Sequence, residues 1–122
     1  MKLKNELYLI KKVDNNSVSI ELLRDSVIYR AHFPEQPITP GVCIIQIATE
    51  LLSEMYAHKF ELSRISNAKF LVVINPENTK DLTYKIKKIT LSEEDKTAKV
   101  SIEVTDRETV FTKLSLVYNI YD

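Results

Sequence analysis

The residues best suited to chemistry lie between His32 and Leu52. The imidazole of His32 titrates near neutral pH, which makes His32 a candidate general base. It stands directly before a rigid loop, because three of the four prolines and the single glycine of the chain fall between Pro34 and Gly41. A histidine in such a loop can also serve to hold backbone groups. Spacing alone leaves both roles open.

The loop leads into a helix that we expect to run from about Pro40 to about Lys59. Thr39 is a good N-cap, and Pro40 suits the first helical position because its missing N–H needs no partner there. Gly41 then presents a backbone N–H that no side chain screens, where an electron-rich oxygen can bind. The same glycine also allows close packing of the loop. Residues 42–52 are mostly apolar, which predicts a helix wrapped on most sides but too short to cross a membrane.

Gln46 and Glu50 are one helical turn apart and therefore share a face of this helix. An amide can orient a hydroxyl group but cannot hand over a proton near neutral pH, whereas a carboxyl group can. The alternative is that Gln46, Glu50, Ser53 and Glu54 form the solvated stripe of the helix.

These residues resemble the 3-hydroxyacyl-acyl-carrier-protein dehydratases of the hotdog fold. The motif of that family runs His-Phe-Pro-Gly-x-Pro-x-x-Pro-Gly-Val-x-x-x-Glu-x-x-Ala-Gln, and the histidine, three prolines, glycine and valine match in register. A weaker match covers residues 65–70. The departures are Glu35 in place of a glycine, Gln46 in place of the acidic residue, and Glu50 in place of the closing glutamine.

The resemblance implies an enzyme that removes water from a 3-hydroxyacyl thioester without any cofactor or metal. His32 would be the base, the N–H of Gly41 would hold the thioester carbonyl, Gln46 would stand where the family has its acid, and Glu50 would be a displaced acid. The resemblance further implies an acyl carrier protein as partner and a homodimer, in which His32 of one subunit faces Gln46 of the other across an acyl tunnel. The rival is a non-catalytic hotdog subunit that binds the carrier protein or an acyl chain, and an acyl thioesterase is third.

The rest of the chain reads mainly as strands. Alternating apolar residues predict strands at residues 17–22, 82–86, 98–104 and 110–120, the last three as an antiparallel meander. Residues 62–74 predict a long strand that is bent or bulged in its middle, and residues 6–13 predict a strand or a short helix. One long helix with five or six antiparallel strands is an α+β layout, which agrees with the hotdog fold. We expect a single domain over residues 1–122.

Composition excludes several classes of function. Seventeen Lys and Arg balance seventeen Asp and Glu, so bulk positive charge for nucleic-acid binding is missing. The single cysteine, Cys43, lies in the apolar helix and is expected to be a buried, inert thiol. Two histidines and one cysteine give no metal-site spacing, and His58 is expected to interact with the C-terminus of the helix. No secretory signal or membrane span is visible, so we expect a soluble cytoplasmic protein.

Three lysines stand on one predicted strand, namely Lys85, Lys87 and Lys88. They are expected to face outward, either as a solvated face that protects a sheet edge or as a weak contact for an acidic carrier protein.

Overall fold

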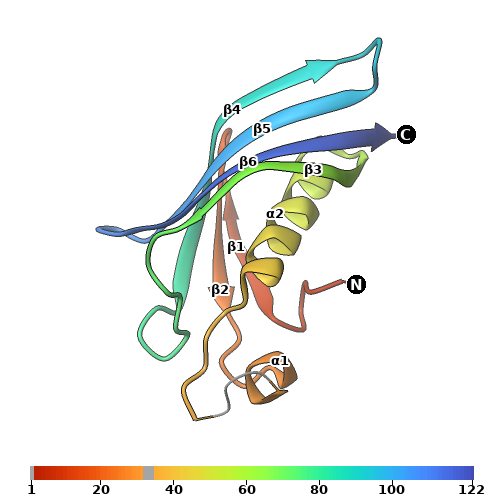
Figure 1. Ribbon diagram of the computed structural model, residues 1–122. Helices are drawn as coiled ribbons and strands as arrows, with labels where there is room; N and C mark the ends of the chain where they lie inside the picture. The colour runs from red at the N-terminus through yellow and green to blue at the C-terminus, as the bar shows by residue number, and fades with distance from the viewer. Residues whose placement is uncertain (1, 32–34) are drawn as a thin grey trace.

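The computed structural model describes residues 2–31 and 35–122. Six strands and two helices follow one another along the chain (Figure 1): β1 (Tyr8–Val13), β2 (Ser17–Leu22), α1 (Val27–Ala31), α2 (Gly41–Tyr56), β3 (Lys59–Phe70), β4 (Asp81–Ser92), β5 (Thr97–Thr105) and β6 (Val110–Tyr121).

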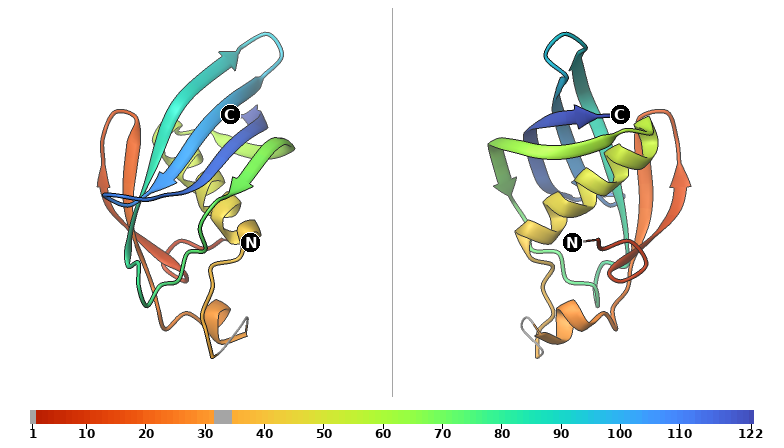
Figure 2. Two further views of the ribbon diagram at one scale, coloured as in Figure 1. Left: turned by 60° about the vertical axis from the view of Figure 1, so that its left-hand side comes forward. Right: turned by 90° about the vertical axis from the view of Figure 1, so that its right-hand side faces the viewer.

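The strands form one antiparallel sheet in the order β1-β2-β4-β5-β6-β3, and this sheet curls around α2 (Figures 1 and 2). The segment from β2 through both helices carries the chain to the far edge of the sheet, where β3 lies. The chain then returns so that β4 pairs with β2. This is the predicted α+β layout, with the meander of β4, β5 and β6 confirmed.

The core lies between α2 and the face of the sheet that α2 covers. Along β2, the alternating Val18, Ile20 and Leu22 are buried as predicted. Polar atoms in this layer find partners, since the Tyr84 hydroxyl donates to the Ile44 carbonyl at 2.9 Å. The helix contributes a broad buried surface: Cys43, Ile44, Ile45, Ile47, Ala48, Leu51 and Leu52.

The start and end of the central helix differ from the prediction. Thr39 is not the N-cap: Pro40 takes that position in an extended conformation, without a side-chain cap, and Gly41 is the first helical residue. The helix ends at Tyr56 rather than near Lys59, because Ala57 adopts the left-handed conformation (φ 54°), a common way to stop a helix.

The strand after the helix spans Lys59–Phe70, so its predicted bounds of 62 and 74 are wrong. The predicted bend is confirmed, because the register of β3 against β6 shifts twice, after Leu62 and after Ile65. The apolar run beyond Phe70 does not continue the strand. The N–H groups of Leu71 and Val72 both donate to the carbonyl of Phe111, at 2.8 and 3.1 Å, which ends the regular ladder.

The structure also decides between strand and helix for residues 6–13 and adds a helix, α1, before the proline-rich loop. Residues 6–13 contain a strand, β1, which begins at Tyr8. The short helix α1 was not predicted, although Ser26 gives a signal for it: the Ser26 hydroxyl accepts a hydrogen bond from the N–H of Ile28 at 3.3 Å, as an N-cap residue does.

Candidate functional site at the start of the central helix

The first turn of α2 presents backbone donors. The N–H groups of Cys43 and Ile44 both donate to the carbonyl of Pro40, at 2.9 and 3.1 Å. Within residues 2–31 and 35–122, no acceptor is recorded for the N–H of Gly41 or of Val42. The first N–H groups of a helix have no intrahelical partner and carry its positive dipole end, so an oxygen with developing negative charge is stabilised there.

Gly41 also packs closely against a side chain of β3. A Cβ atom at this position would lie 2.8 Å from Cζ of Phe70, and 3.1 and 3.2 Å from its two Cε atoms. Phe70 ends β3, and half of its surface is exposed. Both sequence interpretations of Gly41, as donor and as packing residue, are therefore compatible with the geometry.

The loop before α2 is fixed at Thr39. The hydroxyl of this buried residue lies 2.8 Å from the hydroxyl of Tyr29 on α1, and its N–H donates to the carbonyl of Ile74 at 2.9 Å. Burial raises the pKa of Tyr29 to about 12, so its phenol stays protonated at neutral pH. Thr39 thus ties the helix start to α1 and to the segment that follows β3. His32, the expected base, lies outside the described residues.

Gln46 and Glu50 contact each other on α2. The Gln46 side chain donates from Nε2 to Oε2 of Glu50 at 2.9 Å, and both residues are half-buried. The predicted pairing on one helix face is therefore correct. The contact fixes the Nε2 side of the amide toward Glu50.

Glu50 holds the N-terminal segment of the chain. Its Oε2 accepts from the N–H of Leu3 at 2.7 Å, and its Oε1 accepts from the N–H of Lys4 and the hydroxyl of Tyr8, both at 2.9 Å. Burial and then the charge of Glu50 raise the pKa of Tyr8 well above its ordinary value, so Tyr8 remains a donor. The solvated-stripe interpretation is therefore wrong for Glu50.

The other end of the predicted stripe is mixed. Ser53 is half-buried and accepts the N–H of Phe60 at 3.1 Å, whereas Glu54 is exposed and pairs with Lys4 at 2.7 Å. His58 follows the end of α2, and its Nδ1 lies 3.3 Å from Oδ1 of Asp122, so its partner among the described residues is Asp122 rather than the helix terminus. Cys43 is buried, and burial raises the pKa of its thiol, as an inert cysteine requires.

Sequence reasoning missed two contributors to this region. Phe70 gave no signal as a partner of Gly41, because their contact joins residues far apart in the chain. Tyr8 gave no signal as a partner of Glu50, since 42 positions separate them.

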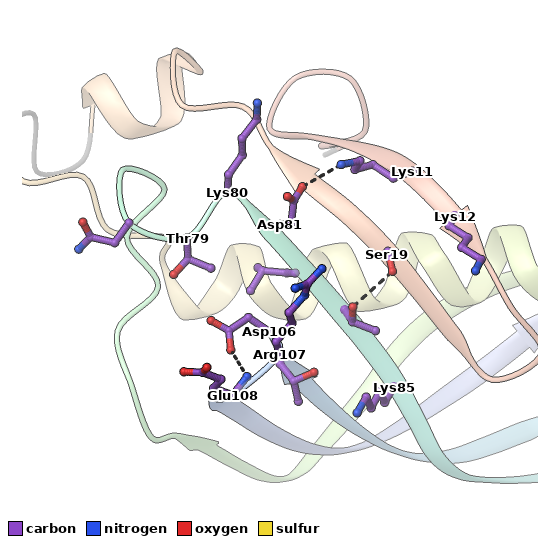
Figure 3. Close-up of a pocket in the computed structure, with 14 residues that line it drawn as sticks. Lys11, Lys12, Ser19, Thr79, Lys80, Asp81, Lys85, Asp106, Arg107 and Glu108 are labelled. Carbon is purple, nitrogen blue, oxygen red and sulfur yellow. Dashed lines mark hydrogen bonds and ion pairs between the residues drawn. The ribbon is translucent and has the colours of Figure 1, made fainter.

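An open groove of about 860 Å³ is lined by no residue of α2, and most of its lining residues are charged (Figure 3). Lys11 pairs there with Asp81 at 3.2 Å, and Asp106 accepts the N–H groups of Glu108 and Thr109, which lower the pKa of its carboxyl group. Such a lining does not suit an acyl chain. Across the described ranges, no group of three or more His, Cys, Asp or Glu side chains is placed to hold a metal ion, and no helix is both long and apolar enough to cross a membrane.

Comparison with known proteins identifies relatives. The family described as ApeI-like, ApeI dehydratase, matches residues 10–113. No curated protein gives a match. Among solved structures, similar chains occur in the dehydratase heterocomplex ApeI:P from Xenorhabdus doucetiae (19% identity, 100% of both chains covered, TM-score 0.63) and in a mutant thioesterase from Pseudomonas aeruginosa (17% identity, 93% of this chain and 81% of that chain, TM-score 0.66). A putative thioesterase from Lactococcus lactis is similar too (13% identity, 99% and 98% covered, TM-score 0.63). These likenesses confirm the predicted hotdog fold.

Proposed function

Because the chain belongs to the ApeI-like dehydratase family, we propose that it removes water from a 3-hydroxyacyl thioester of an acyl carrier protein, giving the trans-2-enoyl thioester. The observation that carries the proposal is the start of α2. There the N–H groups of Gly41 and Val42, which have no acceptor within residues 2–31 and 35–122, open a helix directly after the proline-rich motif.

The reaction needs a base and a stabilised enolate. His32 takes the proton from the carbon next to the thioester carbonyl, and the N–H of Gly41 donates to the oxygen on which negative charge develops. The electron pair then forms the new double bond, and the 3-hydroxyl group leaves with one added proton as water. Removing one donor of this kind in other enzymes costs about 3 kcal/mol in the barrier.

Among the described residues, the proposed site lacks an evident general acid to supply the added proton. Gln46 stands at the matched position of the acid and is not a proton donor near neutral pH. Glu50 is the nearby carboxylate on the same face, but its two oxygens accept four hydrogen bonds. Loss of a general acid lowers a rate by about 10²- to 10⁴-fold, so we expect a slow dehydratase when the chain acts alone.

A second candidate function follows from the same contact. Gln46 stands at the position of the family's acid, and its amide donates a hydrogen bond to Glu50. Such a chain suits a non-catalytic subunit, which binds the carrier protein or its acyl chain while a partner subunit performs the reaction. The solved structure from Xenorhabdus doucetiae is itself a heterocomplex, which supports this alternative.

We also propose a homodimer as the default assembly of the chain, with His32 of one subunit facing Gln46 of the other. The edge strand β3 exposes Leu62 and Ile65, and an exposed apolar strand edge favours pairing with another chain.

The decisive experiment is incubation of the purified protein with a 3-hydroxyacyl thioester of an acyl carrier protein, followed by mass spectrometry. Loss of water from the acyl group supports dehydration, and release of free 3-hydroxy acid indicates a thioesterase instead. An unchanged thioester together with binding of the carrier protein favours the non-catalytic subunit.

A further inference from the structure

The outer face of the sheet, opposite α2, collects positive charge although the chain as a whole has a formal net charge of zero. Strand register aligns its side chains in three rows across β3, β6, β5 and β4. These rows are Lys69–Lys113–Glu103–Lys85, Asn67–Ser115–Ser101–Lys88 and Arg64–Val117–Lys99–Thr90. With Lys87, which occupies the bulge of β4, we call these side chains the lysine face.

The cations of the lysine face are exposed, and in the part of the chain that the structure describes none of them is in an ion pair. The single carboxylate within the three rows is Glu103. Lys69 and Lys113 stand directly opposite each other on neighbouring strands. Like charges in that arrangement destabilise a sheet, and although Lys113 also stands opposite Glu103 on β5, no carboxylate stands opposite Lys69 in the register of the described strands. The stability of the fold therefore does not explain the placement of Lys69 beside Lys113.

Two shallow hollows of about 240 Å³ each lie side by side on this face. Ser101 and Ser115 line both of them. One hollow is bordered by Lys88 and Lys99, and the other by Lys69, Lys87 and Lys113 together with the single carboxylate Glu103. Ammonium groups outnumber carboxylates at both rims, which suits the carboxylate of an Asp or Glu side chain.

We propose that the lysine face is a docking surface for an acidic protein, namely the carrier that brings the thioester in the proposed function, on which this inference rests. Neighbouring strands lie about 4.8 Å apart, and alternate residues of one strand about 7 Å apart. Carboxylates one turn apart on an acidic helix are separated by about 5–6 Å, so several can meet lysines of this face at once.

The Lys69 end of the face lies near the candidate site across the edge strand β3. Lys69 immediately precedes Phe70, and the ring of Phe70, on the opposite face of the sheet, contacts Gly41 at the start of α2. A carrier held at the Lys69 end of the face would therefore sit at the sheet edge beside the first turn of α2.

Other occupants fit less well. A membrane-binding surface also inserts apolar or aromatic side chains, and Val117 is the single large apolar residue in the three rows. A surface for single-stranded nucleic acid offers aromatic rings for stacking, and the three rows contain none.

The test measures binding of the holo form of an acidic acyl carrier protein by fluorescence anisotropy. The variant Lys88→Glu/Lys99→Glu reverses two charges that stand opposite uncharged residues. The control Lys2→Glu/Lys12→Glu changes the net charge equally at exposed positions outside the lysine face. We expect at least about 10-fold weaker binding for the Lys88/Lys99 variant, less than about 2-fold for the control, and loss of wild-type binding when salt is raised from about 50 to about 500 mM.

Equal binding by the two variants, or no binding of the carrier by the wild type, would overturn the proposal. So would binding of anionic vesicles or a DNA oligonucleotide to the wild type in preference to the carrier. Dehydration of a free 3-hydroxyacyl pantetheine thioester, measured in parallel, tests the proposed function separately. A protein that fails there but binds the carrier through Lys88 and Lys99 retains the docking surface and loses the dehydratase assignment.

Discussion

At the scale of single residues, the proposed mechanism assigns roles to a motif histidine, to a helix-opening glycine and to an amide that stands in place of an acid. Gly41 has two roles that a substitution can separate, because alanine keeps the backbone N–H and adds only a Cβ. Gln46 differs from the family motif by one functional group, so replacing its amide by a carboxyl group isolates the missing proton donor.

Gly41→Ala should displace the half-exposed ring of Phe70 and destabilise the protein by no more than about 1 kcal/mol, because the added Cβ would lie 2.8 Å from Cζ of Phe70. Urea unfolding measures the effect, with Val42→Ala as an exposed control. Adding Phe70→Leu should recover most of the lost stability. Recovery of stability and activity together indicates that the N–H is the functional group; a Gly41→Ala protein as stable as the wild type would contradict the contact.

Gln46→Glu should raise dehydration by about 10- to 1000-fold, because it restores a proton donor of nearly the same volume. The new carboxyl group would lie where Gln46 Nε2 now donates to Oε2 of Glu50, on the same face of α2. The measurement is the rate of water loss from the acyl group in the wild type and the variant, taken over a range of pH. A gain that is absent at every pH would show that the missing acid is not what limits the rate.

His32→Ala should abolish turnover, because His32 is the only histidine in the matched motif. Circular dichroism and thermal unfolding must show an intact fold for the comparison to count. Full activity in a folded variant would remove His32 from the mechanism.

At the scale of elements, Glu50 links α2 to the segment before β1. This segment buries Leu3 and Leu7 almost completely, so its attachment contributes to the core as well as to the helix. These contacts explain why the half-buried carboxylate of Glu50 is tolerated, because both of its oxygens accept hydrogen bonds.

Glu50→Gln should lower the free energy of unfolding by about 2–4 kcal/mol, because the amide nitrogen would face the donors of Leu3 and Gln46. The matched control is Glu54→Gln, one turn further along α2, where an exposed ion pair with Lys4 is worth less than about 1 kcal/mol. Hydrogen exchange should show faster exchange at the amides of Leu3 and Lys4 in the Glu50 variant alone. Equal stability of the two variants would argue against the anchoring role.

At the scale of the whole molecule, the two sheet edges differ. β1 forms one edge and β3 the other, and β3 carries exposed apolar residues along its length. If the β3 edges of two subunits paired in a symmetric dimer, this apolar surface would be buried. The lysine face would stay open to a partner of opposite charge.

Light scattering should report a mass of at least twice the 14.1 kDa monomer at micromolar concentration. Ile65→Lys on β3 should shift the protein toward monomer, because Ile65 is already half-exposed in the isolated chain and its replacement spares the core. Val13→Lys on β1 is the control, since Val13 is similarly exposed at the opposite edge and should leave the mass unchanged. A wild-type monomer would remove any model in which two subunits share the site.

The sequence by itself determined the parts of this protein that local physics governs. Period-two alternation located β2 and the meander, and the proline-rich run before Gly41 located the start of the central helix within one residue. The order of these elements with the motif indicated the hotdog fold and the dehydratase family. Only the tertiary structure decided where β3 ends, that Glu50 holds the N-terminal segment, that Phe70 covers Gly41, and that lysines from β3, β4, β5 and β6 form one face. Each of these depends on strand register or on contacts between residues far apart in the chain, and neither leaves a periodic trace in the sequence.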